Sequence, residues 1–151
     1  MTPEKGMNRK QDWQIKEDLA NQEITRQMLQ NWLKVDVVPQ NEMSIWDWEF
    51  RISNYLLGLG EYRRRFNAFD TYGDFQFTKK KFYAMKEKAR KEGVPAFMFV
   101  QFDDQFLYFT IDGEPQTQTM RRNHEIRKEE CVCIPKTWFK SLNKLDKELI
   151  F

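Results

Sequence analysis

Two acidic residues, Asp47 and Glu61, lie on either side of a segment that has the pattern of a β-hairpin. From residue 46 to 52, apolar residues alternate with charged ones, as in a strand with one buried face. A turn centred on Asn54 would bring the two carboxylates face to face, with Cβ atoms about 5 Å apart. Such a pair is destabilising unless one acid is protonated or a cation lies between them. The residue types and their spacing therefore indicate a site for a divalent metal ion.

A second feature of the same strand pairing supports the prediction of a hairpin. It places the ring of Trp48 opposite Gly60 and the ring of Phe50 opposite Gly58, so that each bare glycine is covered by an aromatic side chain. The alternative interpretation of the acids is that they are exposed surface residues, neutralised by Arg51 and Arg63.

The composition is compatible with one domain that has its own core. The chain has 151 residues, and its 13 Phe, 5 Trp and 5 Tyr supply large buried areas. A net charge of +2 does not by itself indicate a polyanionic partner. The basic residues are locally clustered, however, and aromatic residues lie between the clusters, which comprise residues 63–65, 79–81, 86–91 and 121–122.

The sequence does not support nucleotide hydrolysis or catalysis by a histidine-activated nucleophile. Gly58 and Gly60 lie inside a predicted strand, so the chain shows no glycine-rich loop that would bind a nucleotide phosphate. The single histidine, His124, has no recognisable nucleophile motif near it, and we expect it on a surface loop.

The cysteines and the hydropathy pattern predict a cytoplasmic protein. Cys131 and Cys133 are two residues apart, so their thiols would point to opposite faces of a strand and would stay reduced. The first residues lack an apolar signal core, and no run approaches the roughly 18 apolar residues of a membrane span.

The order of predicted elements indicates an α/β protein with one sheet and helices packed on it. Thr78 is suited to cap the second helix and Gly93 to end it. The predicted elements are a long helix at 8–34, a short strand at 35–38, the hairpin, a loop at 65–74, a strand at 75–77, a helix at 79–92, strands at 96–102 and 106–111, a polar basic loop at 114–130, a strand at 131–134 and a helix begun by Pro135.

With its elements in this order, the chain resembles the PD-(D/E)XK nuclease superfamily, in particular its Holliday-junction-resolvase-like and phage nuclease members. Asp47 takes the place of the family's first acid, and the run GEYRRR at 60–65 that of its acid-x-lysine motif. The resemblance covers roughly residues 44–140. It implies a restriction-endonuclease-like fold in a single domain, 1–151, with a mixed central sheet flanked by helices. Within it, 1–40 would be an N-terminal helical segment, 41–113 the core, and 114–151 a C-terminal loop, strand and helix.

The resemblance also implies a catalytic metal site. Asp47, Glu61 and the backbone carbonyl of Tyr62 would bind Mg²⁺, or Mn²⁺ in its place. Arg63 stands where the family has lysine, and because arginine stays protonated it can stabilise negative charge but is a poor general base. Lys81, on the following helix, is our first candidate for a displaced lysine.

Two further sets of residues remain as alternatives within this site. The run Glu49-Phe50-Arg51 also has an acid-x-basic pattern, and we rank it second because it lacks an upstream acid at strand spacing. A carboxylate of the first helix, Glu17 or Glu23, would complete the metal ligands if it faced inward, although we expect both to face solvent.

The function implied is metal-dependent hydrolysis of DNA phosphodiester bonds, with branched DNA as a candidate substrate, by a protein whose resolvase-like relatives imply a homodimer. Phosphates would be bound by Arg64, Arg65, Lys79 and Lys80, and an unpaired base could stack on Tyr72 or Phe69. The alternative is a catalytically inactive module of the same fold that binds nucleic acid or a protein partner. A third interpretation is a structural subunit with the first helix as its interface.

Overall fold

The computed structural model describes residues 12–41, 43–121, 128–142 and 145. It contains helices α1 (Asp12–Leu33) and α2 (Lys79–Glu92) and two short 3-10 helices, Phe69–Thr71 and Lys136–Trp138. The strands are β1 (Asp36–Pro39), β2 (Trp48–Ile52), β3 (Tyr55–Arg64), β4 (Asp74–Thr78), β5 (Ala96–Gln101), β6 (Phe106–Thr110), β7 (Gln116–Arg121), β8 (Lys128–Pro135) and β9 (Lys140–Ser141).

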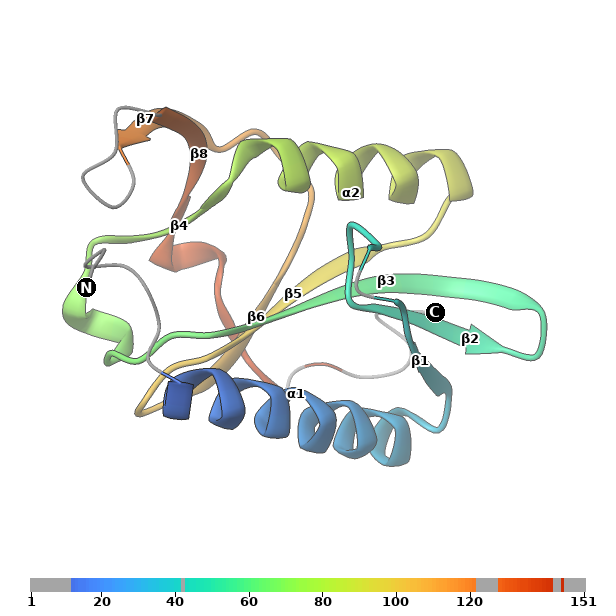
Figure 1. The fold of residues 1–151 in the computed structure, drawn as a ribbon. Helices are drawn as coiled ribbons and strands as arrows, with labels where there is room; N and C mark the ends of the chain where they lie inside the picture. The colour runs from blue at the N-terminus through green and yellow to red at the C-terminus, as the bar shows by residue number, and fades with distance from the viewer. Residues whose placement is uncertain (1–11, 42, 122–127, 143–144, 146–151) are drawn as a thin grey trace.

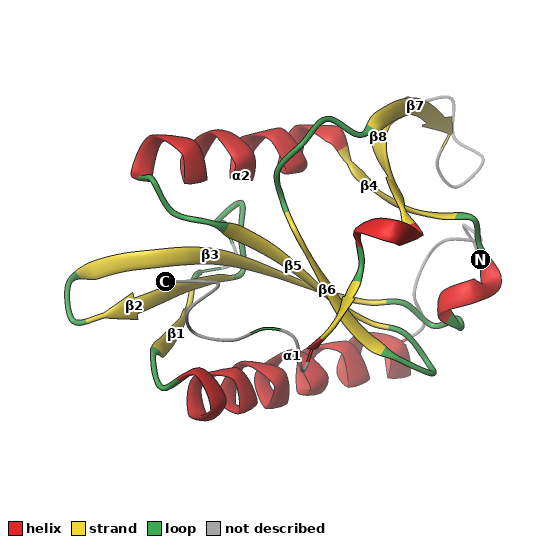
Figure 2. Cartoon of the chain, turned by 180° about the vertical axis from the view of Figure 1, so that it is seen from behind, coloured by secondary structure: helices red, strands yellow, loops and turns green. Residues whose placement is uncertain are grey.

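A six-stranded sheet in the order β1-β2-β3-β5-β6-β9 forms the centre of the molecule. β3 and β5 are parallel, and the other neighbours in this sheet are antiparallel, so the sheet is mixed. α1 lies along one face and α2 along the other, as Figures 1 and 2 show. This is the α/β restriction-endonuclease-like arrangement that the sequence predicts.

Each face of the sheet carries its own aromatic core. On the α2 face, Phe82 and Met85 of the helix belong to one buried cluster with Leu59, Met98 and Phe109 of the sheet. On the α1 face, a second cluster joins helix and strand residues, including Leu29, Leu33, Trp48, Phe50, Tyr62 and Phe99. Because side chains alternate along a strand, β3 contributes to both clusters. Leu59, Glu61 and Arg63 therefore share the α2 face.

The predicted hairpin register is confirmed near the acids. Trp48 pairs with Gly60 and Phe50 with Gly58. Beyond Phe50 the register shifts, so that Ile52 pairs with Tyr55 and only two residues form the turn. Ser53, with φ of 52°, takes the left-handed conformation, and the prediction of a turn centred on Asn54 was wrong. The shift lies beyond the site and leaves its pairing unchanged.

A second sheet, in the order β4-β8-β7, was missed in the sequence. The segment 114–130, predicted as a loop, contains β7 and the first residues of β8. Residues 122–127, which include His124, lie outside the described residues. The prediction failed because Gln116, Thr117 and Gln118 are all exposed on an edge strand, so no apolar alternation marks them. The helix predicted after Pro135 is also wrong, since a single 3-10 turn leads there into β9.

The helices follow the prediction more closely. α2 has the predicted bounds and ends at Gly93 with φ of 69°, where the glycine N–H donates to carbonyls of the last turn. Thr78 precedes α2 but does not cap it, because its hydroxyl donates to Glu129 Oε2 at 3.1 Å. Cys131 and Cys133 are both free and buried. Neither described helix has the length and apolar character needed to cross a bilayer.

Gly60→Ala tests how tightly the hairpin is packed. A Cβ at Gly60 would lie 3.0 Å from the ring of Phe50 and 3.3 Å from that of Trp48, so both rings must shift. We expect a loss of about 1–3 kcal/mol in the free energy of unfolding, measured by chemical denaturation. Gly73→Ala is the matched control, because no atom lies within 4 Å of its Cβ and its φ is not positive. Equal stability of both variants would contradict this packing.

Candidate active site

Backbone hydrogen bonds hold Asp47 against the middle of β3. Its N–H donates to the Gly60 carbonyl at 3.1 Å, and its own carbonyl accepts the N–H of Gln40 at 2.8 Å. Its Oδ2 accepts the N–H of Tyr62 at 2.9 Å. The carboxylate of Asp47 therefore lies beside the Glu61–Tyr62 peptide. Its side chain is 24% exposed, whereas that of Glu61 is fully buried, so the pair has one open and one closed side.

Two cations neutralise the buried carboxylate of Glu61. Lys81 Nζ lies 2.8 Å from Glu61 Oε2, and Arg63 Nη1 forms an ion pair with the same oxygen. Arg63 Nη1 also donates to the Tyr62 carbonyl at 2.9 Å and lies 3.9 Å from Asp47 Oδ2. Residues from the start of β2, from β3 and from the first turn of α2 thus converge on one point of the sheet.

The pKa of Glu61 is raised above its ordinary range. Burial is the main cause, because it penalises the charged form of the carboxyl group. Arg63 and Lys81 lower the pKa, and the negative charge of Asp47 raises it. The two cations do not outweigh burial and the neighbouring acid together, so Glu61 favours additional positive charge nearby.

The oxygen atoms of this cluster fit a hard divalent cation. Glu61 Oε1 is buried and has no hydrogen-bond partner in the described part of the chain. Asp47 uses Oδ2 to accept the Tyr62 N–H, so its carboxylate lies beside the backbone of Tyr62 and could bind a metal ion through its other oxygen. The described residues contain no group of three or more His, Cys, Asp or Glu side chains placed to bind a metal. A metal ion here would therefore keep several water ligands, as Mg²⁺ commonly does.

Phe77 of the second sheet supports Arg63. The guanidinium carbon of Arg63 lies 5.0 Å from the centre of the Phe77 ring, and that of Arg65 lies 4.7 Å from the Phe75 ring. The two rings stack on each other with centroids 6.4 Å apart. Sequence reasoning missed this role, because the alternation in β4 shows that both rings are buried but not what covers them.

The four basic residues predicted to bind phosphates fall into two groups. Arg64 lies on the α1 face of β3, where its guanidinium is held by Asp103 at 2.8 Å and packs over Phe66, so its environment is that of a buried structural residue. Arg65 donates to the Gln76 carbonyl at 3.2 Å. Lys79 and Lys80 begin α2 near the acids; Lys79 pairs with Glu130 at 3.0 Å, and Lys80 is exposed.

The acids kept as alternatives have partners of their own. Arg51 donates to Glu49 Oε1 through two nitrogens, at 2.8 and 2.9 Å, which makes this run a salt bridge. Glu17 Oε1 lies 3.9 Å from Arg64 Nη2. Hydrogen bonds from Arg26 and Gln27 lower the pKa of Glu23 to about 2. None of these contacts places the three acids beside Asp47.

The two aromatic residues proposed for base stacking differ in exposure. The ring of Phe69 packs between those of Phe102 and Phe139, at 5.3 and 5.5 Å. Tyr72 is 64% exposed, so of the two it is the ring open to a ligand.

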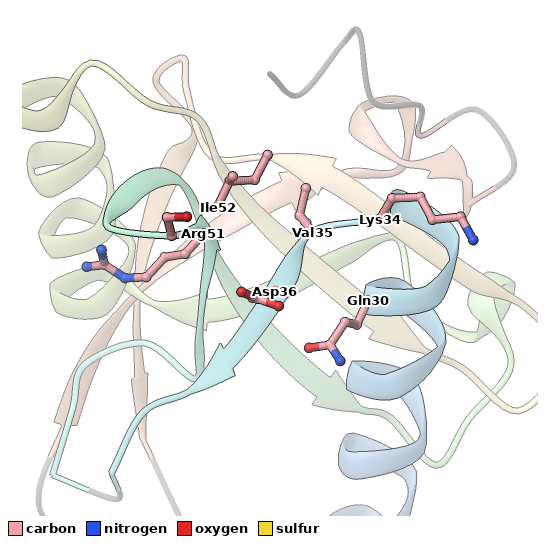
Figure 3. A pocket seen from close by; sticks show the side chains of 7 residues that line it. Gln30, Lys34, Val35, Asp36, Arg51 and Ile52 are labelled. Carbon is pink, nitrogen blue, oxygen red and sulfur yellow. The ribbon is translucent and has the colours of Figure 1, made fainter.

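An open hollow of about 400 Å³ lies away from the acids, where the end of α1 meets β1 and the turn of the hairpin (Figure 3). Its lining comprises Gln30, Lys34, Val35, Asp36, Arg51, Ile52 and Ser53. It contains none of the converging residues, and Arg51 is already engaged by Glu49.

Residues 8–132 match the model of a family described as "Phage putative PDDEXK endonuclease". The chain belongs to this family. Members of the PD-(D/E)XK group generally use divalent metal ions.

The comparison with curated proteins gave no match. Among solved structures, the chain is similar to Hjc of Archaeoglobus fulgidus, a Holliday junction resolvase from an archaeal hyperthermophile. The TM-score is 0.50 at 10% identity, covering 83% of this chain and 93% of that one, and this likeness shows the fold.

The pH dependence of stability tests the charge state of Glu61. An acid whose pKa is raised by folding favours the folded state while protonated, and this contribution is lost as the pH rises through the raised pKa. We therefore expect Glu61→Gln, which stays neutral, to gain stability relative to the wild type as the pH rises above about 4.3, the ordinary pKa of a glutamate side chain. Chemical denaturation at several pH values measures this difference. A difference that does not change with pH would contradict the raised pKa.

Proposed function

We propose that this protein is a metal-dependent endonuclease that hydrolyses phosphodiester bonds in branched DNA, in the cytoplasm of the host cell if it is phage-encoded. The observation that carries the proposal is the convergence of Asp47, Glu61, Arg63 and Lys81 on one point of the sheet, within a chain that belongs to a nuclease family. The likeness to the Archaeoglobus Holliday junction resolvase motivates branched DNA as the substrate. The resolvase-like resemblance of the sequence motivates a homodimer as the assembly.

Asp47, Glu61 and the Tyr62 carbonyl would hold Mg²⁺ or Mn²⁺. When bound, such an ion lowers the pKa of a water molecule and polarises a phosphoryl oxygen. Asp47, whose side chain is 24% exposed, would be the ligand open to DNA. Glu61, on the closed side, is kept from water by the sheet and α2, so its charge acts in a medium of low dielectric constant. The protein thus provides one accessible and one buried ligand.

Arg63 and Lys81 would act differently on the reacting phosphate. Arg63 is always protonated and is positioned by Phe77, so it stabilises the negative charge that develops during attack. Lys81 carries an amine that can hold or release a proton at Nζ, which Arg63 cannot do. We therefore assign to Lys81 the proton-handling role that the family gives to the lysine of its motif.

The DNA backbone would reach this site along the start of α2. Lys79 and Lys80 lie two and one residues before Lys81, and together they would bind phosphates next to the one being cleaved. Arg65, one residue beyond the end of β3, packs over Phe75, the ring next to the Phe77 ring that supports Arg63, and would extend this basic surface.

The second candidate function is a catalytically inactive module that binds nucleic acid or a protein partner. Arg63 favours it, because the cation within the acid-x-basic motif cannot serve as a base. Salt-sensitive DNA binding without cleavage in Mg²⁺ or Mn²⁺ would support this second function over the first.

Lys81→Met tests the catalytic assignment. We expect kcat for cleavage of branched DNA in Mg²⁺ to fall by about a hundredfold or more, because no other amine is paired with Glu61 in the described structure. Lys88→Met, at the far end of the same helix, is the matched control, since Lys88 also pairs with a carboxylate, at 3.0 Å from Glu92. Asp47→Ala should abolish cleavage. Unchanged cleavage by the Lys81 and Asp47 variants would exclude this site.

Replacement of Lys79 and Lys80 by alanine tests the proposed path of the DNA. We expect weaker binding to every DNA sequence, and the slope of log K against log salt should become shallower by about 0.9 for each phosphate that the variant no longer neutralises. Lys91→Ala, in the last turn of α2, serves as the control. Fluorescence anisotropy over a range of salt concentrations provides the slopes. Equal slopes for the double variant and the wild type would place the DNA elsewhere.

A further inference from the structure

The structure describes residues 40, 41 and 43–47 of the connection between β1 and β2, which ends at Asp47. Its two ends are joined by the bond from the Gln40 N–H to the Asp47 carbonyl at 2.8 Å. Inside it, Asn41 accepts the N–H of Met43 on Oδ1 at 2.9 Å and the N–H of Ser44 on its carbonyl at 3.0 Å. Figures 1 and 2 show that the connection rises from the sheet on the α2 side. The loop is therefore shaped by its own hydrogen bonds.

This loop presents apolar side chains to solvent. Met43 is 87% exposed, the highest value among the large exposed apolar residues of the described structure, and Ile45 is 46% exposed. Trp46, which follows, packs against the core on the α2 face. Burial of a Met or Ile side chain is favourable, and the fold leaves most of the apolar surface of Met43 in water.

The exposed side chains lie close to the proposed catalytic residues. Ile45 is two residues and Met43 four residues before Asp47, so an extended chain would place them at most about 7 and 14 Å from it. Successive bases along a strand of DNA are about 3.4 Å apart. A DNA molecule with a phosphate at Asp47 therefore has several base pairs within reach of this loop.

We propose that Met43 and Ile45 form an apolar wedge that packs against the terminal base pair at a branch and so selects branched over continuous DNA. This rests on the proposed function and adds a reason for its substrate preference. Apolar side chains such as Met and Ile can insert between base steps as wedges and unstack them. At a branch the base stack is interrupted in at least one strand, so unstacking the terminal base costs less there than in a continuous duplex.

A DNA partner explains the exposure of Met43 and Ile45 better than a protein partner does. A stable protein interface buries about 800 Å² on each side, far more than two side chains on one loop provide. Met43 and Ile45 also lie in the same loop as Asp47, so a substrate bound at Asp47 would be close to them.

The test uses DNA with 2-aminopurine at the branch, whose fluorescence rises when the base unstacks. Binding is measured in EDTA, so that the readout does not depend on cleavage. We expect the wild type to raise the fluorescence and to bind branched DNA more tightly than linear DNA. In the double variant Met43→Ala/Ile45→Ala, the ratio of the two affinities should fall about tenfold, and most of the fluorescence rise should be lost. The double variant Leu19→Ala/Ile24→Ala is the control, because each of these residues is 64% exposed on α1.

The outcomes separate the wedge from the proposed nuclease activity. If the Met43 and Ile45 variant keeps the fluorescence rise and the preference, or if the wild type shows neither, the wedge is excluded, whether or not the protein cleaves DNA. If the rise depends on these two residues but the wild type does not cleave in Mg²⁺ or Mn²⁺, the wedge stands and the proposed hydrolysis fails. Circular dichroism should be unchanged in both double variants, because the replaced side chains are exposed.

Discussion

The fully buried carboxylate of Glu61 is the constraint on which the site depends. A charge in the middle of a sheet is stable only with cations beside it, and the fold supplies them from two directions. Arg63 comes from the same strand, and Lys81 from α2. The second sheet supports both, because β4 places the Phe77 ring under Arg63 and leads at Thr78 directly into α2. The second sheet therefore helps to hold both cations beside Glu61.

The surroundings of Glu61 favour the binding of additional positive charge. The pKa of Glu61 is raised even with Arg63 and Lys81 in contact, since burial and the charge of Asp47 oppose ionisation. A divalent ion held by both acids would remove their repulsion and favour the ionised form of Glu61. The same feature lowers stability in the absence of the ion, which is the usual relation between an active site and the fold that carries it.

The sequence predicts those parts of the site that depend on local pairing, and not those that depend on packing. Rings opposite Gly58 and Gly60 specify the register that aligns Asp47 with Glu61. Strand period also implies that Arg64 faces away from Arg63, and the structure places its guanidinium on the other face of β3, beside Asp103. The contact of Lys81 with Glu61 depends on where α2 lies, and β7 lacks apolar alternation because it is an exposed edge. Neither could be read from local patterns.

The most direct test of the central claim is a crystal structure of the protein soaked in Mn²⁺, with anomalous diffraction used to locate the metal ion. We expect one peak between Asp47 and Glu61, within coordination distance of both carboxylates and of the Tyr62 carbonyl, with Lys81 or Arg63 displaced from Glu61 Oε2. A Mn²⁺ ion bound only elsewhere, with both cations still paired to Glu61, would contradict the proposed metal centre.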